Sequence, residues 1–119
     1  MDIQDALIAF DALSQETRLR AFRLLVEYGA EGAPAGVLSD ALGIPHNTLS
    51  FHLSHMNNAG LVDSRKEGRL MIYSINIAVF QDLIRFMAED CCSRDVARIR
   101  DSETSNCTVI ELSELAKCC

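Results

Sequence analysis

The 119-residue chain lacks the features that would mark it as a membrane or secreted protein. No apolar run approaches the roughly 20 residues of a membrane-spanning helix, so we expect no membrane partner. Residues 1–5 are acidic where a secretory signal would be basic, and we therefore expect a cytoplasmic protein. Internal repeats and low-complexity tracts are also missing, and the length favours one globular domain.

Basic residues are in the minority. The 11 lysines and arginines face 17 aspartates and glutamates, which gives a net charge of -6. This balance argues against non-specific binding of nucleic acid by the whole surface, although a local basic patch would still suit a sequence-specific protein. Acidic residues are themselves missing from residues 41–62, and all three histidines lie in that window. The window is therefore the first candidate for a functional surface.

Residues 43–56 are typical of the turn and second helix of a helix-turn-helix. Gly43 and Pro45 interrupt the preceding helix, and a new helix is expected to begin near His46 and to end at residues 57–60. An apolar stripe at spacings of four and three residues predicts its buried face. The stripe consists of Leu49, Leu53 and Met56.

The opposite face of this helix carries short hydrogen-bonding side chains instead of the usual glutamates and lysines. Such a face can bind base edges and phosphates in a DNA major groove. A polar surface helix without a binding role is the alternative at this point. The side chains of this face are those of His46, Asn47, Thr48, Ser50, His52 and Ser54.

Three further helices are predicted upstream of the turn. Residues 3–10 form a short amphipathic helix with Ile3, Ala6, Leu7 and Phe10 on its apolar side. Ser14 is expected to cap a helix that runs to Tyr28. A loop is expected at residues 29–36. The next helix covers residues 35–42, with an inner face of Val37, Leu38, Ala41 and Leu42.

A basic β-hairpin is predicted directly after the central helix. Its strands cover residues 61–66 and 70–75, and residues 67–69 form the turn. In this position a basic hairpin is typical of a wing that contacts phosphates or the minor groove, although an ordinary solvated hairpin has the same composition. The basic residues near its tip are Arg65, Lys66 and Arg69.

Asn76 is expected to cap a last helix that ends at residues 89–92. This helix is apolar over much of its circumference, and so small a domain cannot cover it alone, which predicts a homodimer formed by the terminal helices. The sequence therefore predicts a mainly α (α+β) fold. Residues 1–92 form a winged helix-turn-helix with a two-stranded β-hairpin wing, and residues 93–119 form a cysteine-containing C-terminal tail.

Several short segments together resemble the ArsR/SmtB family of winged-helix repressors over roughly the first ninety residues. They are residues 12–20 (ALSQETRLR), 50–53 (SFHL), 59–62 (AGLV), 65–69 (RKEGR) and 73–74 (YS). The resemblance implies a homodimer that binds double-stranded operator DNA and releases it when an inducer binds. It also implies that residues 47, 48 and 50–52 lie on the helix that reads DNA, with Gly68 and Arg69 on the wing.

The known inducer sites of the family do not transfer directly. The arsenic-responsive prototype carries a Cys-Val-Cys motif in the first helix of the helix-turn-helix, where residues 36–40 of this chain have no cysteine. Zinc-sensing members use Asp and His from the last helix, which here has Asp82 but no histidine. His46, His52 and His55 belong to the DNA-facing helix, which disfavours a metal role for them.

All five cysteines lie at the end of the last predicted helix or in the tail that follows it: Cys91, Cys92, Cys107, Cys118 and Cys119. Structural disulfides are not expected in a reducing compartment. Soft thiolates select soft ions, and trivalent arsenic or antimony binds three sulfurs. The Cys91–Cys92 pair resembles the vicinal cysteines of an arsenic-responsive branch of the family. By this resemblance Cys107 is the expected third ligand, with Cys118 or Cys119 as its alternative.

The favoured function is a repressor that dissociates from DNA when As(III) or Sb(III) binds, without an organic cofactor. The alternative is a thiol-based redox or reactive-sulfur sensor in which Cys91 or Cys92 pairs with a cysteine of the tail. A four-thiolate zinc or cadmium site, incidental cysteines and a protein-interaction module also remain open. An enzyme is not expected, because no base is placed beside a nucleophile.

Overall fold

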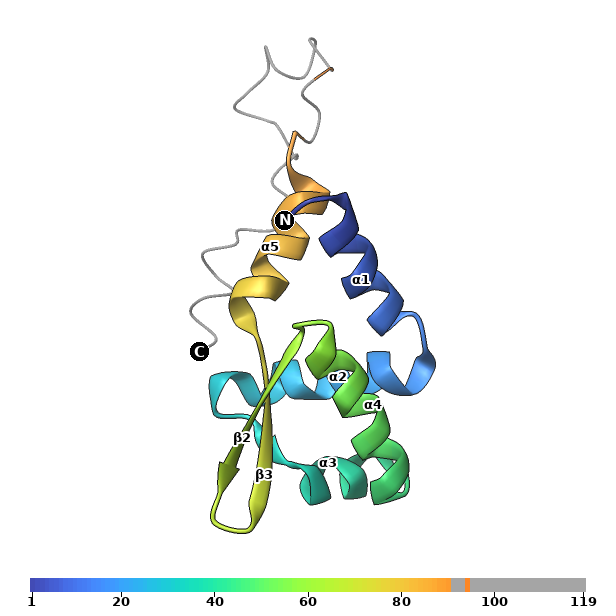
Figure 1. Ribbon diagram of the computed structural model, residues 1–119, viewed down its shortest axis with the longest axis vertical. Coiled ribbons are helices and arrows are strands. Elements are labelled where there is room, and N and C mark those ends of the chain that lie inside the picture. The colour runs from blue at the N-terminus through green and yellow to red at the C-terminus, as the bar shows by residue number, and fades with distance from the viewer. Residues whose placement is uncertain (91–93, 95–119) are drawn as a thin grey trace.

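The computed structural model describes residues 1–90 and residue 94. Helices α1 and α5 rise from one end of the body, α2 crosses beneath them, and α3, α4 and the β2–β3 hairpin lie at the other end (Figure 1). The elements in chain order are α1 (Ile3–Leu13), α2 (Glu16–Tyr28), the 3₁₀ turn η1 (Gly29–Glu31), β1 (Ala33–Pro34), α3 (Ala35–Leu42), α4 (His46–Asn58), β2 (Val62–Glu67), β3 (Leu70–Ile75) and α5 (Ile77–Ala88).

The sheet has three antiparallel strands in the order β1-β3-β2. The hairpin pairs Val62 with Ile75 at its base and Glu67 with Leu70 next to the turn. The sequence predicted a turn over residues 67–69, but β2 continues to Glu67, so only Gly68 and Arg69 lie between the strands. The short strand β1 was not predicted, because residues 29–36 were expected to be a loop. This strand has two residues and exists only because Ala33 pairs with the distant Tyr73.

Helix α4 follows the sequence prediction closely. It begins at His46 after Pro45 and ends at Asn58, followed by a Gly60 with a φ of 81°. The predicted stripe of Leu49, Leu53 and Met56 is fully buried. This stripe joins a core that also contains Leu25, Leu38 and Leu61, so α4 is held against the body with its polar side outward.

The buried side of α1 agrees with the prediction only at Ala6. Its inward residues are Ala6, Ala9 and Ala12, whereas the large apolar residues point outward. The exposed apolar side chains of α1 are Ile3, Leu7, Ile8 and Phe10. Small alanine side chains allow α1 to lie close to α2 and α4, and α1 therefore has two apolar sides rather than one.

Two local assignments upstream of α4 are also corrected. The N-cap of α2 is Gln15, whose side chain accepts from the Arg18 amide at 2.8 Å; the Ser14 hydroxyl donates instead to the carbonyl of Asp11. In α3, Leu38 is buried as predicted, but Val37 is exposed. Ala41 is also exposed, and the inner face of α3 is completed by Ala35 and Ser39.

The last described helix begins where the sequence predicts. The Asn76 side chain accepts from the Val79 amide at 3.3 Å and caps α5. Leu83 is the fully inward residue of α5, whereas the Met87 side chain is 64% exposed. None of the helices in the described part of the chain has the length and apolar character that crossing a membrane requires.

Candidate nucleic-acid interface

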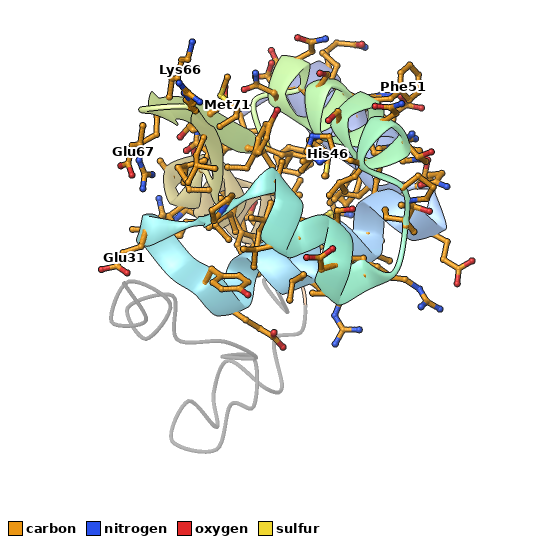
Figure 2. All side chains as sticks on the ribbon, turned by 90° about the horizontal axis from the view of Figure 1, so that it is seen from below. Glu31, His46, Phe51, Lys66, Glu67 and Met71 are labelled. Carbon is orange, nitrogen blue, oxygen red and sulfur yellow. The ribbon has the colours of Figure 1, made fainter. Side chains whose placement is uncertain are left out.

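The outward side of α4 carries most of the residues that the sequence assigned to DNA. His46, Asn47, Thr48 and Phe51 are exposed, and Figure 2 shows Phe51 projecting away from the body. Ser50 and His52 are half-buried at the flanks of this face. Ser54, one turn beyond Ser50 and Phe51, is exposed on the same side of the helix, as the sequence predicted.

No side chain in the described part of the chain caps the N-terminus of α4. Its N-cap residue is Pro45, which offers no side-chain acceptor to the first-turn amides. The first turn also contains no acidic residue. The backbone N–H groups at a helix N-terminus point outward at the positive end of the helix dipole. This end of α4 is therefore suited to binding a phosphate.

A contact from α2 fixes the ring of His52. The Arg18 Nη1 atom lies 3.4 Å from His52 Nδ1, and Arg18 Nε donates to the Ala12 carbonyl at 2.7 Å. Because a guanidinium can only donate, His52 Nδ1 accepts and we assign the ring proton to Nε2. Burial lowers the pKa of His52 from its ordinary value, and the charges of Arg18 and His55 lower it further, which favours the neutral ring.

A second histidine contact connects α4 to α1. His55 Nε2 lies 3.7 Å from a carboxylate oxygen of Asp11. Sequence reasoning missed both contacts because the partners are far apart along the chain; Arg18 precedes His52 by 34 residues. The Arg18 side chain belongs to the segment that resembles repressors, but no local pattern shows what it touches.

The wing holds its three basic residues in different ways. Lys66 and Arg69 are exposed and make no ion pair with any described residue. Arg65 instead pairs with Glu67 at 2.9 Å and donates to the Glu31 carbonyl at 2.7 Å. Figure 2 shows Lys66 on the hairpin beside α4, where its ammonium group could contact a phosphate. Arg65 instead holds the hairpin against η1.

The predicted inducer ligands lie outside the described residues. These are Cys91, Cys92, Cys107, Cys118 and Cys119. Within residues 1–90 and residue 94, no group of three or more His, Cys, Asp or Glu side chains is arranged to hold a metal ion. The three histidines of α4 therefore form no such group with the described acidic residues.

The polar, outward α4 and the basic hairpin beside it define a winged-helix DNA-binding protein. A family model described as a helix-turn-helix domain, HTH_20, matches residues 13–65. The chain is 31% identical over 78 residues to the transcriptional repressor SdpR of Bacillus subtilis, covering 66% of this chain and 83% of SdpR. It is 36% identical over 66 residues to the uncharacterized regulator Rv0081 of Mycobacterium tuberculosis, and it spans only 56% of that relative.

Solved structures give the same architecture. An ArsR-like transcriptional regulator from Rhodococcus sp. RHA1 matches with a TM-score of 0.66 at 24% identity, over 86% of this chain and 93% of that one. The homodimeric winged helix-turn-helix domain of Mb0332 from Mycobacterium bovis, a possible ArsR-family regulator, matches with a TM-score of 0.61 at 23% identity, over 74% and 82% of the two chains. The chain belongs to the helix-turn-helix transcriptional regulators, not to an enzyme family, and its fold is that of the ArsR/SmtB family.

Proposed function

We propose that the chain is a transcriptional repressor that binds operator DNA as a homodimer, with α4 in the major groove and the wing on the backbone. The observation that carries this proposal is the exposed face of α4, where Asn47, Thr48 and Phe51 point outward from a helix without an acidic residue. The N-terminus of α4 and Lys66, which makes no ion pair with the described residues, would add the phosphate contacts that position such a helix. The similarity to a repressor supports the direction of regulation.

The homodimer is proposed from the apolar surface of the terminal helices. α1 exposes Ile3, Leu7 and Ile8, and α5 exposes Met87. The two helices lie at the end of the molecule away from α3 and the hairpin turn (Figure 1). An apolar surface shared by two neighbouring helices is typical of a protein interface, and the structure of Mb0332 is that of a homodimer. A two-fold axis near α1 and α5 would place two α4 helices on one side of the dimer.

For the inducer we propose trivalent arsenic or antimony bound by Cys91, Cys92 and Cys107, with Cys118 or Cys119 as the alternative third ligand. The support is the softness and number of the thiolates, together with the position of Cys91 three residues after the end of α5. A ligand there acts on the helix that we place in the dimer interface. A coupling free energy of about 1–3 kcal/mol between the two sites would weaken operator binding by about 5- to 150-fold.

An arsenite titration of the reduced protein on DNA from its own promoter tests the proposal. We expect arsenite to release the DNA from the native protein but not from Cys91→Ser, Cys92→Ser or Cys107→Ser. A truncation before Cys118 distinguishes the third ligand, since it leaves the response intact only if Cys107 completes the site. Arsenite without effect on any protein, combined with release by an oxidant or polysulfide, would replace the metalloid sensor with a thiol-redox sensor.

A further inference from the structure

Phe51 is the most exposed large apolar residue in the described part of the chain. Its side chain is 69% exposed, and it lies on the polar, outward face of α4 between Asn47 and Ser54. Single exposed apolar residues are common on protein surfaces and mean little alone. What distinguishes this ring is that its neighbours hold it in place.

A chain of three contacts runs from the backbone of α1 to the ring of Phe51. Arg18 is anchored on the Ala12 carbonyl at 2.7 Å, and it reaches His52 at 3.4 Å. The rings of His52 and Phe51 then meet edge to face, with centroids 5.7 Å apart and an angle of 69° between their planes. An exposed side chain that is already held loses less conformational freedom when it binds, so the ring is preorganised for a contact.

The chemistry of the major groove leaves few partners for a phenyl ring. Phosphates and the polar base edges require hydrogen-bond donors or acceptors, which the ring does not have. The main apolar group in the groove is the C5-methyl of thymine. We propose that Phe51 packs against a thymine methyl in each operator half-site, and that Arg18 and His52 position it there. This inference rests on the proposed binding of operator DNA.

The size of the expected effect follows from the burial of one methyl group. Removing a buried methyl changes an affinity by about fourfold. Two half-sites related by the dimer axis would together give a change of about fifteenfold. Both values are well within the range of a fluorescence-anisotropy or gel-shift measurement.

The test begins with a DNA site selected from a random library by the full-length native protein. Each thymine of that site is then replaced by deoxyuridine, which removes only the methyl group. We expect one position per half-site at which uridine weakens the native protein about fourfold. Phe51→Ala should bind the thymine and uridine forms of that site equally. The control Tyr28→Ala, which removes an exposed aromatic ring at the end of α2, should keep the full thymine preference.

The positioning role has its own measurement. Arg18→Lys keeps the charge, but its single nitrogen cannot take the positions of both Nε and Nη1, so the thymine-to-uridine affinity ratio should fall toward one. An unchanged ratio in Arg18→Lys refutes the role of Arg18 and His52. If no thymine-to-uridine replacement weakens DNA binding by the native protein more than it weakens binding by Phe51→Ala, the proposed thymine contact is refuted. The proposed operator binding would not be affected by that result. If the library yields no preferred sequence, the proposed function itself fails.

Discussion

Gly32 connects η1 to β1 and fixes the base of the wing against the body. Its φ of 70° and ψ of -161° lie in a region that only glycine enters readily. A Cβ atom at this position would lie 2.1 Å from the carbonyl oxygen of Tyr73 and 2.8 Å from Cβ of Ser74. Tyr73 is the β3 residue that pairs with Ala33. Gly32→Ala must therefore distort the backbone and separate β1 from β3.

Two other glycines provide matched controls for the size of this effect. Gly43 has a φ of 68° and a ψ of 31°, and a Cβ there meets nothing within 4 Å, so Gly43→Ala should cost about 1–2 kcal/mol for its left-handed backbone alone. Gly36 lies inside α3 with open space around it, and Gly36→Ala should stabilise the protein by about 0.5–1 kcal/mol. Gly32→Ala combines a strain of about 1–3 kcal/mol with the loss of strand pairing, for a total of about 3 kcal/mol or more.

Urea denaturation followed by circular dichroism, at one fixed protomer concentration, measures all three variants. The expected order of stability is Gly36→Ala above native, then Gly43→Ala, then Gly32→Ala. Operator affinity should fall most in Gly32→Ala because the wing is displaced. If Gly32→Ala and Gly43→Ala had equal free energies of unfolding, the close approach of the Cβ atom to Tyr73 would add no destabilisation. That result would refute the expected separation of β1 from β3.

Further predictions concern the core, the wing and the histidine of α4. Leu53→Ala should lower the free energy of unfolding by about 2–5 kcal/mol, whereas the adjacent exposed Ser54→Ala should change it by less than about 0.5 kcal/mol, both measured in urea. Lys66→Ala should weaken binding of all DNA sequences and reduce the slope of log affinity against log salt by about 1, as measured by anisotropy; Arg65→Ala should change that slope less, because Arg65 is engaged by Glu67. The lowered pKa of His52 means that the unfolded chain binds a proton at a pH where the folded chain does not, so stability should fall as the pH drops below the ordinary histidine value and approaches the folded pKa. Urea midpoints at neutral and mildly acidic pH should differ less in His52→Asn than in the native protein, and equal pH dependence in the two would contradict the assignment.

The parts of the fold that were predictable depend on local patterns. The stripe of Leu49, Leu53 and Met56 fixed both the type and the inward face of α4, and Asn76 marked the start of α5. The hairpin followed from the alternation in β3 and the turn at Gly68, although Glu67 was placed in the turn instead of at the end of β2. Each of these features is set by residues close together in the sequence, which is why periodicity and capping reveal them.

The features that were missed depend on contacts between distant residues. Strand β1 exists because Ala33 pairs with Tyr73, and a two-residue strand is too short to show a sequence pattern that predicts this pairing. The inward side of α1 was misassigned because large apolar residues outweigh alanines in a periodicity argument, although the alanines are what permits close packing. The contact between Arg18 and His52 likewise needs the folded chain.

The exposed face of α4, which we propose contacts DNA, has few charges. This affects how the protein would find its operator. Attraction to DNA of any sequence comes from neutralisation of its phosphates by positive charge. In the described interface, the groups that can neutralise phosphates are mainly Lys66, Arg69 and the N-terminus of α4. The net charge of -6 opposes that attraction. The protein should therefore dwell briefly on random DNA and travel mostly through solution rather than by long sliding. Few molecules would be sequestered by the chromosome, so a small number of copies would suffice to keep one operator occupied.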